Sequence, residues 1–157
     1  GSVEVGYDNH PGRQPEFNIV KNVEAARAVF AAPWDITLAP LDVCGALVLR
    51  GERYAKVAAS GNPRAATVIG NYCDWNHFKD HPEGQSSILY DTVAAYLVAD
   101  TAWCKMETRT LSIDDKGNTV PDPAGRPVRC ALGWNDRNAF EDRLVAALAG
   151  NHASGNP

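Results

Sequence analysis

Residues 22–42, Asn-Val-Glu-Ala-Ala-Arg-Ala-Val-Phe-Ala-Ala-Pro-Trp-Asp-Ile-Thr-Leu-Ala-Pro-Leu-Asp, place a helix pattern directly before a strand pattern. Asn22 is suited to cap the helix, the alanines favour its interior, and Pro33 ends it. The run from Asp35 to Pro40 is short and rich in β-favouring residues, which predicts a buried strand. A helix followed closely by a strand is typical of an α/β fold. We therefore expect a mostly parallel open sheet with helices on both faces.

The same alternation continues through the rest of the 157 residues. The predicted helices span residues 22–32, 52–59, 62–75, 88–100 and 135–148. The predicted strands span residues 35–40, 102–113 and 127–132, with a short extended piece at 47–49. Gly- and Pro-containing polar segments at 3–18 and 79–87 are predicted to be loops. We expect one domain over residues 1–150 and a flexible polar tail over 151–157.

The composition excludes several classes of protein. Hydrophobic residues make up 45% of the chain and charged residues 22%, which is typical of a globular protein and not of a disordered one. A net charge of −4 without a basic run argues against nucleic-acid binding. The apolar runs are shorter than the roughly 18 residues of a membrane span.

The four cysteines, Cys44, Cys73, Cys104 and Cys130, are widely spaced and form no CxxC pair. This spacing favours free, mostly buried thiols over a zinc site or a disulfide framework. Reduced thiols fit a cytoplasmic location. The sequence also lacks GxSxG, HExxH, GxxxxGK[ST] and GxGxxG, so nothing supports a serine hydrolase, a zinc protease or a nucleotide-binding loop.

Two short segments combine residues that are suited to a sugar or a metal ion. Glu16 and Asn18 lie two positions apart, and in an extended segment they project to the same side. Together they offer acceptors and a donor for the vicinal hydroxyls of a sugar, although both residues are also common at helix starts. Asp91 lies at the start of an apolar helix, where it can cap the helix or bind a hard cation.

The loop that follows Asp74 contains Trp75, His77 and His81. Polar loops with His and aromatic residues can close over a pocket as lids, and a solvated surface loop is the alternative. We expect no chemistry from His10 or His152, which lie in a Pro-Gly loop and in the tail.

Read in order, these segments resemble the C-terminal half of the inosine-uridine preferring nucleoside hydrolases. The resemblance spans roughly residues 3–148. The matching segments are Pro15-Glu-Phe-Asn-Ile-Val20, Asn22-Val-Glu-Ala-Ala-Arg-Ala-Val-Phe30, Ile36-Thr-Leu-Ala-Pro-Leu-Asp42 and Ser87-Ile-Leu-Tyr-Asp-Thr-Val-Ala-Ala-Tyr96.

The resemblance implies a calcium-dependent N-ribohydrolase, which cleaves the N-glycosidic bond of a ribonucleoside to ribose and free base. Such enzymes hold one Ca²⁺ that binds the ribose hydroxyls and the attacking water. Asp91 matches the family's C-terminal calcium ligand, and Glu16 and Asn18 match its ribose-binding pair. Asn9 is the nearest match to an asparagine that lies upstream of that pair in the family, with a loop that differs by one residue.

The sequence also departs from the family pattern. The Asp-rich calcium motif D-x-D-x-G-x-D-D is absent from this sequence, and we therefore expect the chain to be about half of the family's fold. The histidine that precedes the calcium aspartate in the family is Tyr90 here. A phenol has a pKa near ~10 and is a less ready proton donor at neutral pH. Tyr90, His77 and His81 are therefore the candidate leaving-group acids, with Trp75 as a further lid residue.

Two hypotheses follow. The chain is part of a nucleoside hydrolase that is inactive without its N-terminal half, or it is a non-catalytic stand-alone domain of the same ancestry that binds a sugar or nucleoside or mediates assembly. The first predicts a small ribonucleoside as substrate. Because half a sheet leaves an edge and an apolar face uncovered, we also expect self-association or pairing with the missing half. The sequence does not distinguish purine from pyrimidine bases.

Overall fold

The structure, a computed structural model, describes residues 1–76 and 84–150. The tail predicted over 151–157 lies outside the described residues. The chain forms two compact units. The first unit combines Gly1–Leu47 with Ile88–Asn135, and the second combines Val48–Ser87 with Asp136–Pro157.

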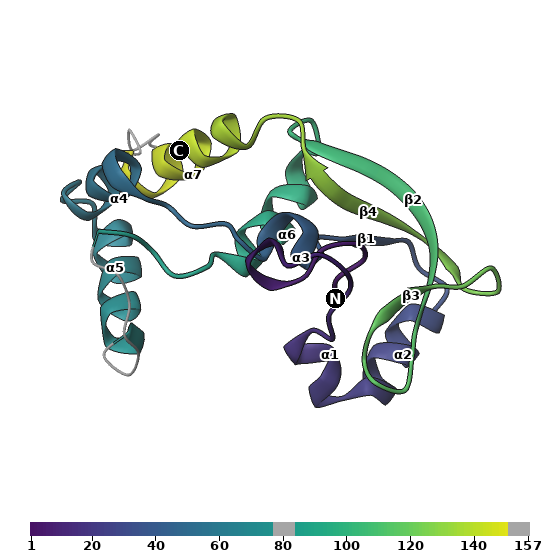
Figure 1. Ribbon diagram of the computed structural model, residues 1–157. Helices are drawn as coiled ribbons and strands as arrows, with labels where there is room; N and C mark the ends of the chain where they lie inside the picture. The colour runs from purple at the N-terminus through teal and green to yellow at the C-terminus, as the bar shows by residue number, and fades with distance from the viewer. Residues whose placement is uncertain (77–83, 151–157) are drawn as a thin grey trace, which may run out of the picture. The chain divides into compact units, whose positions relative to one another are not determined.

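The first unit is built on an open sheet of four strands in the order β1-β4-β2-β3 (Figure 1). The strands are β1 Ile36–Leu38, β2 Cys104–Ile113, β3 Thr119–Pro121 and β4 Arg126–Trp134. β1 is parallel to β4, whereas β2 is antiparallel to both β3 and β4. The α/β class and the open sheet are thus confirmed, but the sheet is mixed rather than mostly parallel. The short turn between β2 and β3 explains this, because parallel neighbours need a crossover of about a dozen residues.

The first unit also contains a 3₁₀ turn and four helices. They are η1 Tyr7–Asn9, α1 Phe17–Lys21, α2 Val23–Ala31, α3 Leu41–Cys44 and α6 Tyr90–Ala99. The predicted helices at 22–32 and 88–100 are confirmed, and Asn22 caps α2 through a 2.9 Å bond from the Ala25 N–H. The short helices α1 and α3 were not predicted, since four or five residues carry no helical period.

The core of this unit lies on one face of the sheet. The register pairs Ile36 with Val128 and Leu38 with Cys130, and strand alternation places these four side chains on the same side. The core cluster consists of Val3, Leu111, Val128 and Cys130, with Phe30, Ile36, Leu38 and Leu132 packed against it. Helix α2 contacts β2, and α3 contacts β4.

Part of the other face of the sheet is polar and exposed. Its exposed side chains among the described residues include Thr37, Thr108, Thr110 and Arg129. The expected second layer of helices therefore does not cover these four positions. This mixed sheet contains antiparallel pairs, and sheets with such pairs can leave one face in water.

The described residues of the second unit form three helices. They are α4 Gly51–Ala58, α5 Pro63–Asn76 and α7 Arg137–Ala149, close to their predicted bounds. The Arg53 guanidinium of α4 lies 2.8 Å from a carboxylate oxygen of the buried Glu141 and 2.8 Å from one of Asp142, both on α7. These ion pairs join α4 to α7. Residues 47–49, predicted to be extended, belong to no strand.

Candidate functional site

The N-terminal segment is fixed to α3 by one carboxylate. The side chain of Asp42 accepts the backbone N–H groups of Val3 at 2.8 Å, Glu4 at 2.7 Å and Val5 at 3.1 Å. Ser2 and Val3 are buried as a result. Asp42 thereby positions the turn that follows, which carries Tyr7 and Asn9.

That turn has an unusual backbone. Asp8 and Asn9 have positive φ angles of 51° and 59°. Asp and Asn tolerate this left-handed region better than other residues with a Cβ, although such a conformation still costs of order 1 kcal/mol each. Two hydrogen bonds support it, from the Tyr7 N–H to Gln14 Oε1 at 2.9 Å and from the Asp8 N–H to the Gly45 carbonyl at 3.1 Å. The turn leaves the Asn9 side chain exposed.

Glu16 is the N-cap of α1, and its side chain is only 16% exposed. Its two carboxylate oxygens accept the N–H groups of Asn18 at 3.0 Å and Ile19 at 3.2 Å. Asn18 lies in the first turn of α1 with an exposed side chain. The expectation of an extended segment is therefore wrong at Asn18, because the Glu16 carboxylate satisfies the free N–H groups that start a helix.

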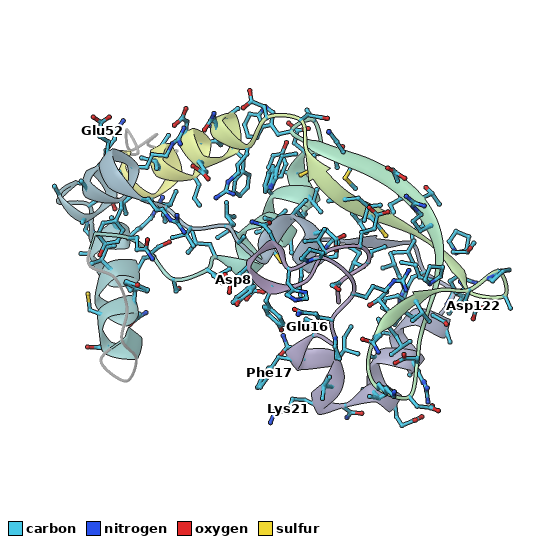
Figure 2. The ribbon with its side chains drawn as sticks, in the orientation of Figure 1. Asp8, Glu16, Phe17, Lys21, Glu52 and Asp122 are labelled. Carbon is cyan, nitrogen blue, oxygen red and sulfur yellow. The ribbon has the colours of Figure 1, made fainter. Side chains whose placement is uncertain are left out.

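Tyr7 links this element to a distant part of the chain. Its phenol oxygen accepts the N–H of Phe17 at 3.1 Å, and its ring makes an edge contact with Tyr90, with centroids 6.1 Å apart and planes at 83°. Figure 2 labels Glu16 and Phe17 at the start of α1 and Asp8 in the turn that precedes it in the chain. Tyr7 and Asp42 carry no sequence signal of these roles, because nothing in their spacing marks a residue that positions others.

Tyr90 and Asp91 form the first turn of α6. No side chain caps this helix at Leu89, and Asp91 is exposed, so the capping alternative for Asp91 finds no support. Burial, followed by the neighbouring Tyr7 and Asp8, raises the pKa of the Tyr90 phenol. A raised pKa keeps the phenol protonated at neutral pH, but it also makes Tyr90 a weaker proton donor.

Two of the charges that act on the Cys44 thiol belong to the two predicted segments. Burial raises the pKa of the Cys44 thiol to about 11, and the carboxylates of Glu16 and Asp91 add to that rise. The Glu16 carboxylate also raises the pKa of Tyr90, but it does so less than burial, Tyr7, Asp8 and Cys44. The contacts that link the two segments are those of Tyr7, which accepts the Phe17 N–H and packs against the Tyr90 ring.

The described residues contain no group of three His, Cys, Asp or Glu side chains that would hold a metal ion. Calcium takes six to eight oxygen ligands, so a single carboxylate such as Asp91 does not make a site. The described residues thus do not form a complete calcium site by themselves. Trp75 lies in α5, whereas His77 and His81 lie outside the described residues.

The prediction of free thiols is confirmed. All four cysteines are free, and Cys73 is exposed while the other three are buried. Burial raises the pKa of Cys104 and of Cys130 to about 11, as it does for Cys44. These three thiols are therefore poor nucleophiles.

Among the described helices, none combines the length and the apolar composition needed to cross a bilayer.

Comparison with known proteins places this arrangement in one family. Residues 1–142 match the family described as inosine-uridine preferring nucleoside hydrolase. None of the curated proteins matches the chain. Its fold is similar to that of a purine-preferring ribonucleoside hydrolase from Gardnerella vaginalis, with a TM-score of 0.72 and 18% identity over 96% of this chain and 50% of that one.

Two further solved structures show the same likeness. A plant nucleoside hydrolase, PpNRh1, has a TM-score of 0.74 and 17% identity over 96% of this chain and 52% of that one. An inosine-uridine preferring nucleoside hydrolase from Bacillus anthracis has a TM-score of 0.61 and 22% identity over 94% of this chain and 47% of that one. The chain therefore spans about half the length of the solved structures that it matches.

Proposed function

Because the chain belongs to the inosine-uridine preferring nucleoside hydrolase family, we propose that it supplies part of the active site of an enzyme that hydrolyses the N-glycosidic bond of ribonucleosides. The products would be ribose and the free base. The observation that carries this proposal is the chain of contacts that joins the Glu16 cap of α1 to α6. The Phe17 N–H donates to the Tyr7 phenol, and the Tyr7 ring contacts that of Tyr90, the residue before Asp91.

In this proposal, Glu16 and Asn18 bind the ribose hydroxyls. Each carboxylate oxygen has more than one lone pair, so Glu16 can accept from a hydroxyl while it still caps α1. The capping bonds fix the orientation of the carboxylate before the sugar arrives. N-glycosidic cleavage passes through an oxocarbenium-like transition state, and a preoriented carboxylate stabilises its positive charge. Asn9, exposed in its left-handed turn, is a third candidate contact to ribose.

Asp91 supplies one carboxylate ligand to a Ca²⁺ ion in the same proposal. Its exposure and its freedom from a capping role support this assignment. The other ligands would come from the half of the fold that this chain does not span, and the chain alone would bind calcium weakly and be inactive. Tyr90 remains the candidate leaving-group acid among the described residues, and His77 and His81 remain candidates outside them. Free thiols fit a cytoplasmic location.

The test is the substitution Glu16→Gln in a protein that contains both halves of the fold, with inosine and uridine as substrates. We expect kcat/KM to fall by about a hundredfold, because one charged contact to the transition state is lost. Glu24→Gln, on the exposed surface of α2, is the matched control and should leave kcat/KM unchanged. A fall in Tm with unchanged kcat/KM for Glu16→Gln would mean that Glu16 only caps α1.

A further inference from the structure

The side chain of Tyr7 contacts two segments that lie far apart in the chain. Its phenol oxygen accepts the Phe17 N–H at 3.1 Å, and its ring makes an edge contact with the Tyr90 ring at a centroid distance of 6.1 Å. Phe17 begins α1 directly after Glu16, and Tyr90 begins α6 directly before Asp91. One half-buried side chain therefore joins the starts of these two helices.

The first contact completes the N-terminal turn of α1. This helix has five residues, a length at which a helix depends on its caps and its packing. Both oxygens of Glu16 already accept the N–H groups of Asn18 and Ile19. The N–H of Phe17, the first of the helix, is bonded to Tyr7 instead. Loss of the Tyr7 oxygen would leave this N–H to water and would loosen the turn that orients Glu16 and Asn18.

The second contact restrains the start of α6. No side chain caps this helix at Leu89, and Tyr90 is 40% exposed. The planes of the Tyr7 and Tyr90 rings meet at 83°, which is a favourable arrangement because the edge of an aromatic ring is positive and its face is negative. The Tyr7 ring therefore helps to hold the residue that directly precedes Asp91.

Tyr7 is itself held in place through its backbone. Its N–H donates to Gln14 Oε1 at 2.9 Å, and the Gln14 N–H donates to Oγ of the buried Ser2 at 2.7 Å. Gly6 permits this close approach, because a Cβ at that position would collide with the Gln14 side chain. A residue that is fixed in this way can impose a position on the groups that it contacts.

We infer that Tyr7 is a positioning residue that holds the start of α1, with its proposed ribose contacts, in register with the start of α6, with its proposed metal ligand. The inference rests on the proposed function, because that function gives the two segments their roles. Tyr7 acts through Glu16 and Tyr90 and does not itself touch the substrate. Its phenol oxygen orients α1 and its ring orients Tyr90, so the two effects can be removed separately.

The first test measures kcat and KM for inosine and uridine in a protein that contains both halves of the fold. Tyr7→Phe keeps the ring but removes the hydrogen bond to α1, so kcat/KM should fall by about fivefold, the factor for one lost neutral hydrogen bond. Tyr7→Leu also removes the ring contact, and the fall should reach about twenty-five-fold. Tyr54→Phe, on α4 in the second unit, is the matched control and should leave kcat/KM unchanged.

A double-mutant cycle distinguishes positioning from a merely structural role. If Tyr7 acts through Glu16, Tyr7→Phe should cause no further fall in kcat/KM once Glu16→Gln is present. The same fall in both backgrounds would overturn the inference, and so would a kcat/KM for Tyr7→Phe that equals that of the Tyr54→Phe control. An equal fall for Tyr7→Phe and Tyr7→Leu would also overturn it, because the ring contact would then have no effect.

A second measurement tests the positioning without catalysis. In NMR spectra of the 157-residue chain, Tyr7→Leu should shift both the Phe17 amide signal and the Tyr90 ring signals, whereas Tyr7→Phe should shift mainly the Phe17 amide. Unchanged Tyr90 signals in Tyr7→Leu would overturn this inference whatever the activity of the whole protein. Absence of hydrolysis by the unaltered protein with both halves would instead overturn the proposed function on which the inference rests.

Discussion

Asp42 is the residue whose removal should most clearly loosen the candidate site. Its carboxylate accepts three backbone N–H groups, those of Val3, Glu4 and Val5. The substitution Asp42→Ala removes all three hydrogen bonds at once. The bond from Glu4 is exposed and water can replace it, so the loss comes mainly from the part-buried N–H groups of Val3 and Val5.

The expected loss can be worked from these two bonds. A hydrogen bond to a charged group contributes about 1.5–3 kcal/mol, and we take the lower end because Asp42 itself is only half-buried. Two such bonds give about 3 kcal/mol. At about 2–4 °C per kcal/mol for a chain of this size, the Tm should fall by about 6–12 °C.

Thermal unfolding followed by circular dichroism measures this change, and amide hydrogen exchange localises it. We expect the amides of residues 3–5 and of the turn at Tyr7–Asn9 to lose protection. Asp115→Ala is the control, because Asp115 is 94% exposed and only pairs with Arg27 on the surface. A Tm that falls no further for Asp42→Ala than for this control would refute the reasoning, as would unchanged protection of residues 3–5.

Three further outcomes can be checked. Tyr7→Phe keeps the ring contact with Tyr90 but removes the acceptor of the Phe17 N–H. A lost hydrogen bond of about 1 kcal/mol should accelerate amide exchange at Phe17 by about fivefold or more. A thiol reagent at pH 8 should modify Cys73 alone in the folded chain and all four thiols after denaturation. Hydrogen bonds from Asn118 hold the pKa of Asp114 below its usual value, so this carboxylate stabilises the β2–β3 turn above about pH 4. That contribution should disappear as the pH falls through the folded-state pKa, and Asp114→Ala should abolish this pH dependence in an NMR titration of the turn.

The larger elements were predictable because their signals are local. The Asn22 cap and the alanine-rich interior specify α2, and the β-favouring run after Pro33 specifies β1. The sheet directions were not predictable in this way. Whether β4 pairs with β1 or with β2 depends on contacts between distant residues, and β4 pairs with both.

The candidate site shows the same division. Glu16, Asn18 and Asp91 are found by residue type and by resemblance, since carboxylates and amides beside helix starts stand out in a sequence. Tyr7 and Asp42 do not stand out, because their roles are to hold other residues in place and appear only in three dimensions. The local geometry of Asn18 was missed for a related reason, because a glutamate N-cap is less common than Ser, Thr, Asp or Asn.

The most direct test of the proposed function is the calcium dependence of nucleoside hydrolysis in a protein that contains both halves of the fold. Release of the base from inosine and uridine is measured at increasing Ca²⁺ for the unaltered protein, for Asp91→Asn and for the control Asp35→Asn, an exposed carboxylate in the loop before β1. We expect calcium-dependent turnover that Asp91→Asn abolishes and Asp35→Asn preserves. Unchanged turnover and unchanged calcium dependence in Asp91→Asn would contradict the assignment of this residue to the metal and, with it, the proposed site.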